Sequence, residues 1–336
     1  MKPTDITKEK GVYIIEEDNN TKCRDKIQLT KDKYCVVRIL FFTMGLVHFV
    51  PFTFFTTAND YWMYKFRDAD NAIYDTSENR TTLQAHFSAA ITIATNVPLV
   101  AFVLLTTTYG HYVSARKRVY YSIVLMLATF IISTIFIELN TDGWQTEFFI
   151  LTMILISIIN SGRAVYRISI FEIIPKFPSC SVAYFLAGEG LAGIFNSMLQ
   201  ILSLLVGTST KTSALIYFIS GSAVMLFAIG FYNFGERMTY YKAYASTEGY
   251  YKKNITFKDI IESSKIIWPS IIIILFLYIA QLTTSPSITS LVKSEASGNV
   301  WSETYFVPVI TFLLNNVCDF IGRTVGSKVS KVNFLI

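Results

Sequence analysis

Charged residues are scarce in this sequence. Of its 336 residues only 16% are Asp, Glu, Lys or Arg, whereas 52% are hydrophobic. Soluble domains carry roughly a quarter charged residues, so this composition argues against a soluble domain. Phe and Tyr are abundant, with 27 and 20 copies, as expected of membrane helices whose aromatic residues lie at both interfaces. The composition therefore indicates a membrane protein with several spans.

Residues that commonly carry metal or enzyme chemistry are also few. The three His residues are dispersed, and the four Cys residues stand apart without a Cys-x-x-Cys pair. Neither a metal site nor a disulfide framework is therefore predicted. The sequence shows no nucleophile–base pattern and no Gly-rich phosphate loop. We expect no enzyme activity, and hence no catalytic residues, no metal and no cofactor.

Long hydrophobic runs recur along the whole chain. Each is about 20 residues long, which is the length of helix that crosses the hydrocarbon core of a bilayer. The first 34 residues are polar, so the first run is expected to act as an uncleaved signal anchor. We predict an all-α polytopic membrane protein with spans at residues 35–58, 85–108, 118–139, 147–171, 182–206, 213–233, 266–290 and 303–327.

The distribution of Lys and Arg predicts the orientation of these spans. Basic residues concentrate in the N-terminal tail, at 116–118 and in the long polar loop, which places these segments in the cytoplasm. This bias explains the formal net charge of +5 without nucleic acid as a partner. Asn79 heads an Asn-Arg-Thr sequon in the first outer loop and is expected to be glycosylated. The expected divisions are a cytoplasmic tail at 1–34, a six-helix bundle at 35–233, a cytoplasmic loop at 234–265 and a partial two-helix bundle at 266–336.

Three polar residues interrupt the last hydrophobic run. Asn316, Asp319 and Arg323 are spaced i, i+3, i+7, so a helix places them on one face. Because a carboxylate and a guanidinium are costly in lipid, this face is expected to line the protein interior or a water-filled path. Two interpretations stay open: Asp319 and Arg323 form a structural i,i+4 pair, or they take part in substrate contact or gating.

Polar residues also occur in earlier spans. Asn160, Arg163 and Arg167 share one face of the fourth span, and Glu189 lies in the fifth. Two guanidinium groups in mid-membrane need partners or water, unless Arg167 extends its charged end to the inner leaflet. His48 in the first span is expected to be a packed or interfacial imidazole, with a proton-relay role as the alternative.

Short motifs follow one another along the chain, each in or beside an expected span. The first span contains Gly45-Leu46 and Pro51-Phe52-Thr53-Phe54-Phe55, the fifth contains Gly188-Glu189-Gly190-Leu191-Ala192-Gly193, and the last contains Asn316-x-x-Asp319-x-x-Gly322-Arg323. In this order they resemble the motifs of the equilibrative nucleoside transporter family. The resemblance covers the first eight of that family's eleven spans. It implies a major-facilitator-like helical bundle. In this sequence the bundle would consist of six spans, an inner loop and the first two spans of an incomplete second half.

This resemblance also implies a function. It implies transport of nucleosides, with nucleobases as a further candidate substrate, by facilitated diffusion with alternating access, and we expect the plasma membrane as the location. The alternative is a truncated or diverged relative that does not transport and acts at most as a membrane interaction partner. Aromatic residues in these spans have packing as their alternative role. The positions expected to contact substrate are Phe49, Phe52, Thr56, Asn96, Leu99, Arg167, Glu189, Asn316, Asp319 and Arg323.

The chain departs from the resembled family at three of these positions: Phe52 stands where that family has Trp, and the other two departures introduce charge. Arg167 and Glu189 each stand where that family has Gln. The two replacements are opposite in charge and lie in adjacent spans that a short loop makes antiparallel neighbours. We therefore predict that Arg167 and Glu189 form a compensating ion pair, with Arg163 as the alternative partner of Glu189.

Overall fold

A computed structural model of the chain describes most of the expected spans. The described residues are 35–68, 81–206, 209–245, 257–284 and 298–329, together with Asp32, Val292, Ser294 and Glu295. They are mainly helical and include no strand. Within them, seven helices are long and apolar enough to cross a membrane. The chain is thus an all-helical, polytopic membrane protein.

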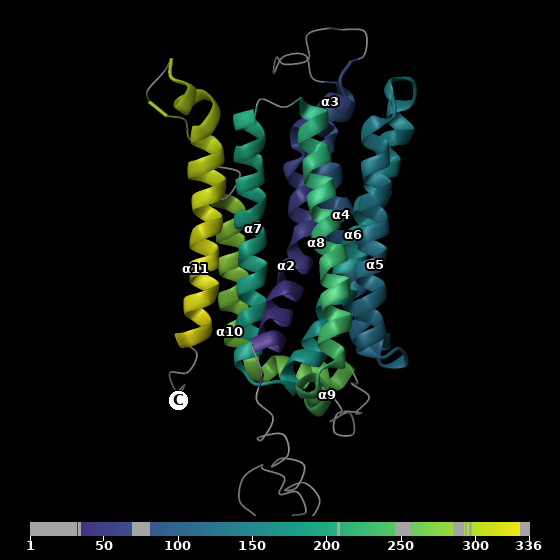
Figure 1. Cartoon of the computed structure of the whole chain (residues 1–336), viewed down its shortest axis with the longest axis vertical. Helices are drawn as coiled ribbons and strands as arrows, with labels where there is room; N and C mark the ends of the chain where they lie inside the picture. The colour runs from purple at the N-terminus through teal and green to yellow at the C-terminus, as the bar shows by residue number, and fades with distance from the viewer. Residues whose placement is uncertain are drawn as a thin grey trace, which may run out of the picture.

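The long helices lie side by side in one bundle, with α5 at one side, α11 at the other, and α2 and α8 between them (Figure 1). Their bounds are α2 Val36–Thr57, α3 Asn59–Lys65, α4 Thr82–Tyr109, α5 Ala115–Glu138, α6 Gln145–Ile173, α7 Cys180–Val206, α8 Thr210–Arg237, α9 Thr239–Ala245, α10 Phe257–Thr284 and α11 Leu314–Val329. The first six expected spans agree with these helices to within a few residues at most ends. The first span continues past a turn at Ala58 into α3.

The last two spans differ in detail from the expectation. Helix α10 begins at Phe257, so the predicted loop at 234–265 is helical at both ends and also contains α9. The span expected at 303–327 is helical, but it begins with π-helical turns at Trp301–Tyr305 and Val307–Leu313. It is not among the seven apolar helices, and its second part, α11, carries the polar face predicted from the sequence.

Hydrogen bonds of side chains fix helix ends on the side of the bundle where α3 ends and α4 begins. Thr81 and Gln84 form a capping box at the start of α4, in which each side chain accepts from the other residue's backbone amide. The buried Lys65 donates to the carbonyl oxygens of Phe136 at 3.1 Å and Leu139 at 2.6 Å. These carbonyls lie at the end of α5 and have no partner within their own helix, so Lys65 satisfies them.

Glycine residues set the spacing between α7 and its neighbours. A Cβ atom at Gly45 on α2 would collide with the carbonyl oxygen of Phe185, and one at Gly188 on α7 would collide with that of Phe42. The two backbones therefore touch, which only residues without a side chain permit. On the other side of α7, a Cβ at Gly193 would lie 2.6 Å from Asn316 Oδ1. Helix α7 is thus held in close contact with both α2 and α11.

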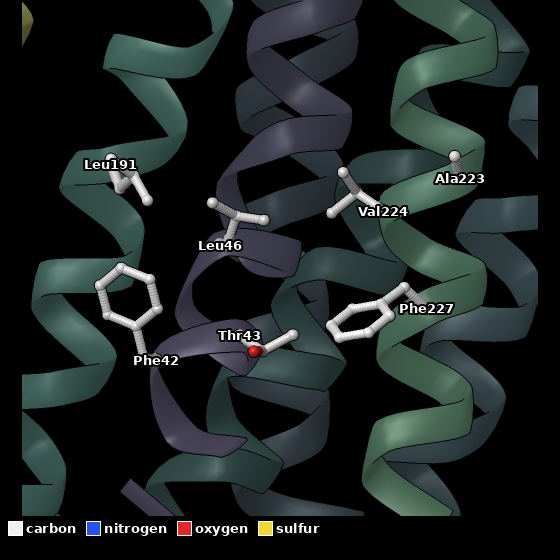
Figure 2. A pocket seen from close by; sticks show the side chains of 7 residues that line it. All are labelled: Phe42, Thr43, Leu46, Leu191, Ala223, Val224 and Phe227. Atoms are coloured by element: carbon white, nitrogen blue, oxygen red, sulfur yellow. The ribbon is translucent and has the colours of Figure 1, made fainter. Parts of the chain in front are cut away.

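An apolar groove of about 400 Å³ lies where α7 and α8 diverge over α2 (Figure 2). It is lined by Phe42, Thr43, Leu46, Leu191, Ala223, Val224 and Phe227. The Thr43 hydroxyl already donates to the carbonyl oxygen of Ile39 within α2. Because the lining offers no charged group, this groove does not supply the polar site expected from the sequence.

Candidate functional site

A buried carboxylate, that of Glu189, lies at the centre of the bundle. Its residue is 2% exposed, and it sits on α7 between the glycines that contact α2 and α11. Those close approaches bring side chains of both neighbouring helices within reach of its two oxygens. A carboxylate this deeply buried needs compensating charge or hydrogen bonds, and the structure supplies both.

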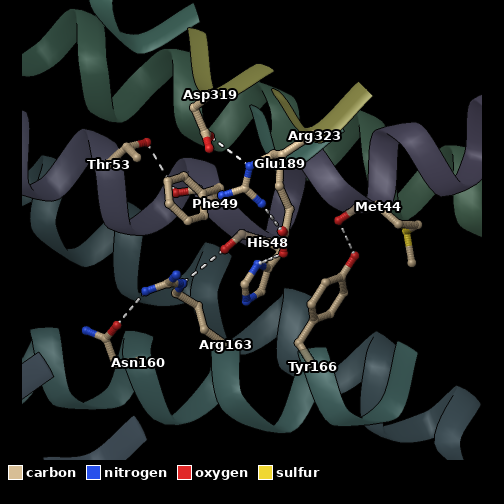
Figure 3. Close-up of polar contacts among 10 residues, drawn as sticks. All are labelled: Met44, His48, Phe49, Thr53, Asn160, Arg163, Tyr166, Glu189, Asp319 and Arg323. Atoms are coloured by element: carbon tan, nitrogen blue, oxygen red, sulfur yellow. Dashed lines mark hydrogen bonds and ion pairs between the residues drawn. The ribbon is translucent and has the colours of Figure 1, made fainter. Parts of the chain in front are cut away.

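The guanidinium of Arg323 compensates the charge of Glu189. Its Nη1 lies 2.8 Å from Glu189 Oε2, and its Nε lies 2.7 Å from Asp319 Oδ2, one turn earlier on α11. Arg323 therefore bridges two carboxylates on two helices, as Figure 3 shows. Its side chain is 27% exposed, whereas that of Glu189 is 1% exposed. The ion pair between them is buried on one side only.

The second oxygen of Glu189 contacts His48. His48 Nδ1 lies 2.7 Å from Glu189 Oε1, and the imidazole is almost completely buried. Its ring is parallel to that of Tyr166, with the ring centroids 6.1 Å apart, and the Tyr166 hydroxyl donates to the Met44 carbonyl at 2.7 Å. The histidine is thus held between α6 and α7, with Nδ1 at ion-pair distance from the carboxylate but not aligned with it as a hydrogen bond.

Arg163 extends the network to α6. Its Nε donates to the backbone carbonyl of His48 at 3.0 Å, and its Nη1 donates to Asn160 Oδ1 at 2.7 Å. The guanidinium carbon lies 4.7 Å from the centroid of the Phe52 ring and 5.7 Å from that of Phe49. The aromatic faces thus stabilise a buried cation. Arg163 has separate partners and does not form an ion pair with Glu189.

Asn316 connects α11 to α7 beside these charges. Its Nδ2 donates to the Gly193 carbonyl at 3.1 Å and to Ser197 Oγ at 2.8 Å. The Gly193 carbonyl is exposed to this amide because the residue has no side chain. Asn316, Asp319 and Arg323 therefore face the bundle, which confirms the inward orientation predicted from their spacing.

We call the set Asn160, Arg163, His48, Glu189, Asp319 and Arg323 the polar cluster. It joins α6, α2, α7 and α11 in one chain of contacts (Figure 3). Guanidinium groups donate hydrogen bonds and carboxylates accept them, so the cluster presents both donors and acceptors. It holds two acidic groups and two guanidinium groups, and charge is therefore nearly balanced before any ligand binds.

The predicted pair of Arg167 and Glu189 is wrong. Both residues are described, and the ion pairs of Glu189 are with His48 and Arg323. Arg167 is exposed, and its guanidinium carbon lies 5.7 Å from the centroid of the Phe171 ring. The sequence places both charged residues on neighbouring helices but does not give the rotation of each helix about its axis. In the structure Arg323, and not Arg167, lies within ion-pair distance of Glu189.

Of the other expected contact residues, some lie beside the polar cluster and others lie away from it. Phe49 and Phe52 lie beside the polar cluster, over the guanidinium of Arg163. Asn96 is on an exposed face of α4, where its Nδ2 donates to the Thr92 carbonyl at 2.9 Å. Leu99 lies one turn further on the same helix and is partly buried. The side chain of Thr56 and the whole of Asn79 lie outside the described residues.

His48 is the member of the cluster that sequence reasoning undervalued. Packing was its favoured role, yet the structure places its Nδ1 against a buried carboxylate. The signal was the same one that singled out Asp319, namely an ionisable side chain inside an apolar span. The partner of a single imidazole cannot be found from residue spacing, because Glu189 is far away in the sequence and lies on another helix.

Comparison with known proteins agrees with this arrangement. The family profile described as "Nucleoside transporter" matches residues 153–258 and 246–331, which include Arg163, Glu189, Asp319 and Arg323. The chain belongs to the nucleoside transporter family. Its members are transporters and not enzymes, so the absence of an enzyme signature in the sequence agrees with the family.

Several curated relatives align over most of the chain. Equilibrative nucleoside transporter 1 of Rattus norvegicus is 27% identical over 345 residues, covering 88% of this chain and 74% of the relative. Equilibrative nucleoside transporter 2 of Homo sapiens is also 27% identical, over 88% of this chain and 75% of the relative. Equilibrative nucleoside transporter 3 of Rattus norvegicus is 22% identical, over 89% and 68% respectively.

Proposed function

We propose that this member of the nucleoside transporter family carries nucleosides, and nucleobases with them, across the plasma membrane by facilitated diffusion. The carrier would work by alternating access, with its N-terminus in the cytoplasm. Family membership supports the substrate class, since the matching profile and the relatives are named for nucleoside transport. Neither a cofactor nor a metal takes part in this proposal.

The position of Arg323 is the observation on which the proposal mainly rests. Its guanidinium bridges Asp319 on its own helix and Glu189 on α7, in a half-buried position. A guanidinium and a carboxylate at one point offer both donors and acceptors to a ribose diol. Carriers bind substrate near mid-bilayer, where two groups of helices meet. We propose that this point lies between the 35–233 bundle and the 266–336 segment.

The substrate-contact residues of the proposal include the remaining expected positions. Arg323 and Asp319 would bind the ribose, and Asn316 would hold α11 against α7. Phe49 and Phe52 would offer aromatic faces to the base, on the side of the cluster where Arg163 now contacts them. Thr56, Asn96, Leu99 and Arg167 would complete the site in other conformations of the carrier.

Uptake of labelled uridine and adenosine by cells that lack their own nucleoside carriers tests this function. We expect saturable uptake that excess unlabelled nucleoside inhibits. Arg323→Ala should abolish it while surface biotinylation still detects the protein. Asp142→Asn, which breaks the 3.2 Å outer ion pair with Arg67, is the matched control and should keep uptake. Surface protein without any uptake would instead support the transport-inactive relative.

A further inference from the structure

Glu189 divides its two oxygens between two different cationic partners. Oε2 lies 2.8 Å from Arg323 Nη1, and Oε1 lies 2.7 Å from His48 Nδ1. Of the two partners, Arg323 can leave Glu189 at the lower electrostatic cost. It keeps a second carboxylate, Asp319, at 2.7 Å, and its side chain is 27% exposed to solvent. His48 and Glu189 are both almost completely buried and belong to helices whose backbones touch at Gly45 and Gly188.

Removal of Arg323 from Glu189 would leave a buried carboxylate without its cation. Such a charge is strongly destabilising unless another positive charge replaces the lost one. His48 is already in contact with the carboxylate, so protonation of this imidazole supplies that charge without any movement of a helix. We propose that His48 and Glu189 form a proton-binding site that gains one proton when Arg323 leaves Glu189.

The site of the added proton follows from the contact. Because Nδ1 faces the carboxylate, it carries a proton in both states, and Nε2 is the nitrogen that gains the second. Before the step, Glu189 balances Arg323 and the imidazole is neutral. After it, Glu189 balances the imidazolium, and the guanidinium is free for Asp319 and for the hydroxyl groups of a ligand. One proton from solvent enters, and no covalent bond between heavy atoms changes.

The other ionisable groups around the site come from each packed helix. Arg163 and Arg167 on α6 act on His48 through space, as does Glu189 on α7. Asp319 and Arg323 face it from α11, and Tyr166 on α6 covers the imidazole ring. Tyr278 on α10 acts on Arg163 only. Arg167 also acts on Glu189 through space, but neither arginine of α6 forms an ion pair with Glu189, so His48 is the group in contact with the carboxylate when Arg323 leaves.

This inference rests on the proposed function for its consequence in transport. If the hydroxyl groups of a nucleoside draw Arg323 away from Glu189, substrate binding takes up a proton. Linkage then requires that affinity rises as pH falls, by at most about tenfold per pH unit for one proton. In this chain the coupling would depend on His48 and Glu189, whose contact carries the proton.

Histidine NMR tests the proton site without any transport measurement. The chain has three His residues, and His86 and His111 are exposed. ¹⁵N-histidine-labelled full-length protein in lipid nanodiscs should therefore give one buried signal, assigned by its loss in His48→Gln. At pH 6.5, Arg323→Gln should shift the His48 signal toward the imidazolium position. Adding Glu189→Gln to Arg323→Gln should return the signal to the neutral position, because the carboxylate that stabilises the imidazolium is then absent. Arg67→Gln, in the outer ion pair, should leave it unchanged.

Each result decides the inference. If Arg323→Gln does not move the His48 signal while His86 and His111 report folded protein, or if the signal moves equally without the Glu189 carboxylate, the proton site is refuted. Uptake at pH 5.5–8 then tests the coupling. The KM of the wild type should decrease as the pH is lowered, and the KM of His48→Gln should not change with pH. A wild type that takes up no nucleoside at any pH would refute the proposed function, whereas the NMR shifts would still support the site.

Discussion

The guanidinium of Arg323 lies 2.8 Å from the carboxylate of Glu189, although 134 positions separate the two residues in the sequence. This contact joins α11 to α7 at the level where α7 also touches α2. Because Glu189 is buried and Arg323 is partly exposed, removing Arg323 should destabilise the protein more than removing the Glu189 carboxylate. Loss of the cation leaves a buried charge that has to be offset by protonation of His48, whereas loss of the carboxylate leaves a cation that Asp319 still holds.

This asymmetry predicts different costs for the two single substitutions. Arg323→Gln should lower the free energy of unfolding by about 3 kcal/mol, since a buried carboxylate loses its cation. Glu189→Gln should cost less, about 1 kcal/mol, because Arg323 keeps Asp319 and is partly solvated. Thermal unfolding of purified protein in detergent, followed by tryptophan fluorescence, measures both.

The double substitution isolates the interaction itself. Arg323→Gln with Glu189→Gln should be more stable than the sum of the single costs predicts, by about 1–2 kcal/mol. Arg67→Gln with Asp142→Asn, at the outer ion pair, should show coupling of less than about 1 kcal/mol. Equal coupling at the two sites would contradict the burial argued for Glu189.

The contact between α2 and α7 predicts a second effect on stability. Gly188→Ala places a methyl group against the carbonyl of Phe42, where backbone and not a flexible side chain must move. Overpacking of this kind costs about 1–3 kcal/mol, and the displaced α7 should also weaken the contacts of Glu189. Gly230→Ala on α8 is the matched control, since nothing lies within 4 Å of its Cβ position. Melting temperatures of the two proteins should therefore differ, with only Gly188→Ala lowered.

The sequence predicted the features that depend on one helix at a time. Span positions follow from hydrophobic runs, and the shared face of Asn316, Asp319 and Arg323 follows from the 3.6-residue period. The cost of charge in lipid then gave the inward direction of that face. Each of these arguments needs no knowledge of the neighbouring helices, and the structure agrees with each.

Contacts between helices were predictable only in part. The sequence offered Arg167, with Arg163 as the alternative, as the partner of Glu189, whereas the structure has Arg323. The choice depends on how α7 is rotated and how closely it approaches α11. Gly190 and Gly193 determine that approach, yet the sequence gives their small size and not the helix they face. The π-helical turns at Trp301–Tyr305 and Val307–Leu313 likewise had no sequence signal. They depend on backbone hydrogen bonding over a whole segment.

The orientation predicted from Lys and Arg has a direct test at Asn79. If the first loop is extracytoplasmic, Asn79 is glycosylated, and glycosidase treatment should increase the mobility of the protein on a gel. Asn79→Gln should remove this shift. Asn254 heads another sequon in the expected cytoplasmic loop and serves as the internal control. Modification at Asn254 in place of Asn79 would reverse the orientation.

Arg167 is the residue whose predicted behaviour changes most with the structure. It is exposed, its ring contact is with Phe171 at 5.7 Å, and it acts on His48 and Glu189 through space without an ion-pair contact to Glu189. Arg167→Gln should therefore change the free energy of unfolding by less than about 1 kcal/mol. Combined with Glu189→Gln, its effects on unfolding should add within about 0.5 kcal/mol, as for independent sites. A compensating ion pair would instead make the double substitution more stable than the two single effects predict. Thermal unfolding of the four proteins distinguishes these outcomes, and uptake by the same proteins should show no recovery in the double variant.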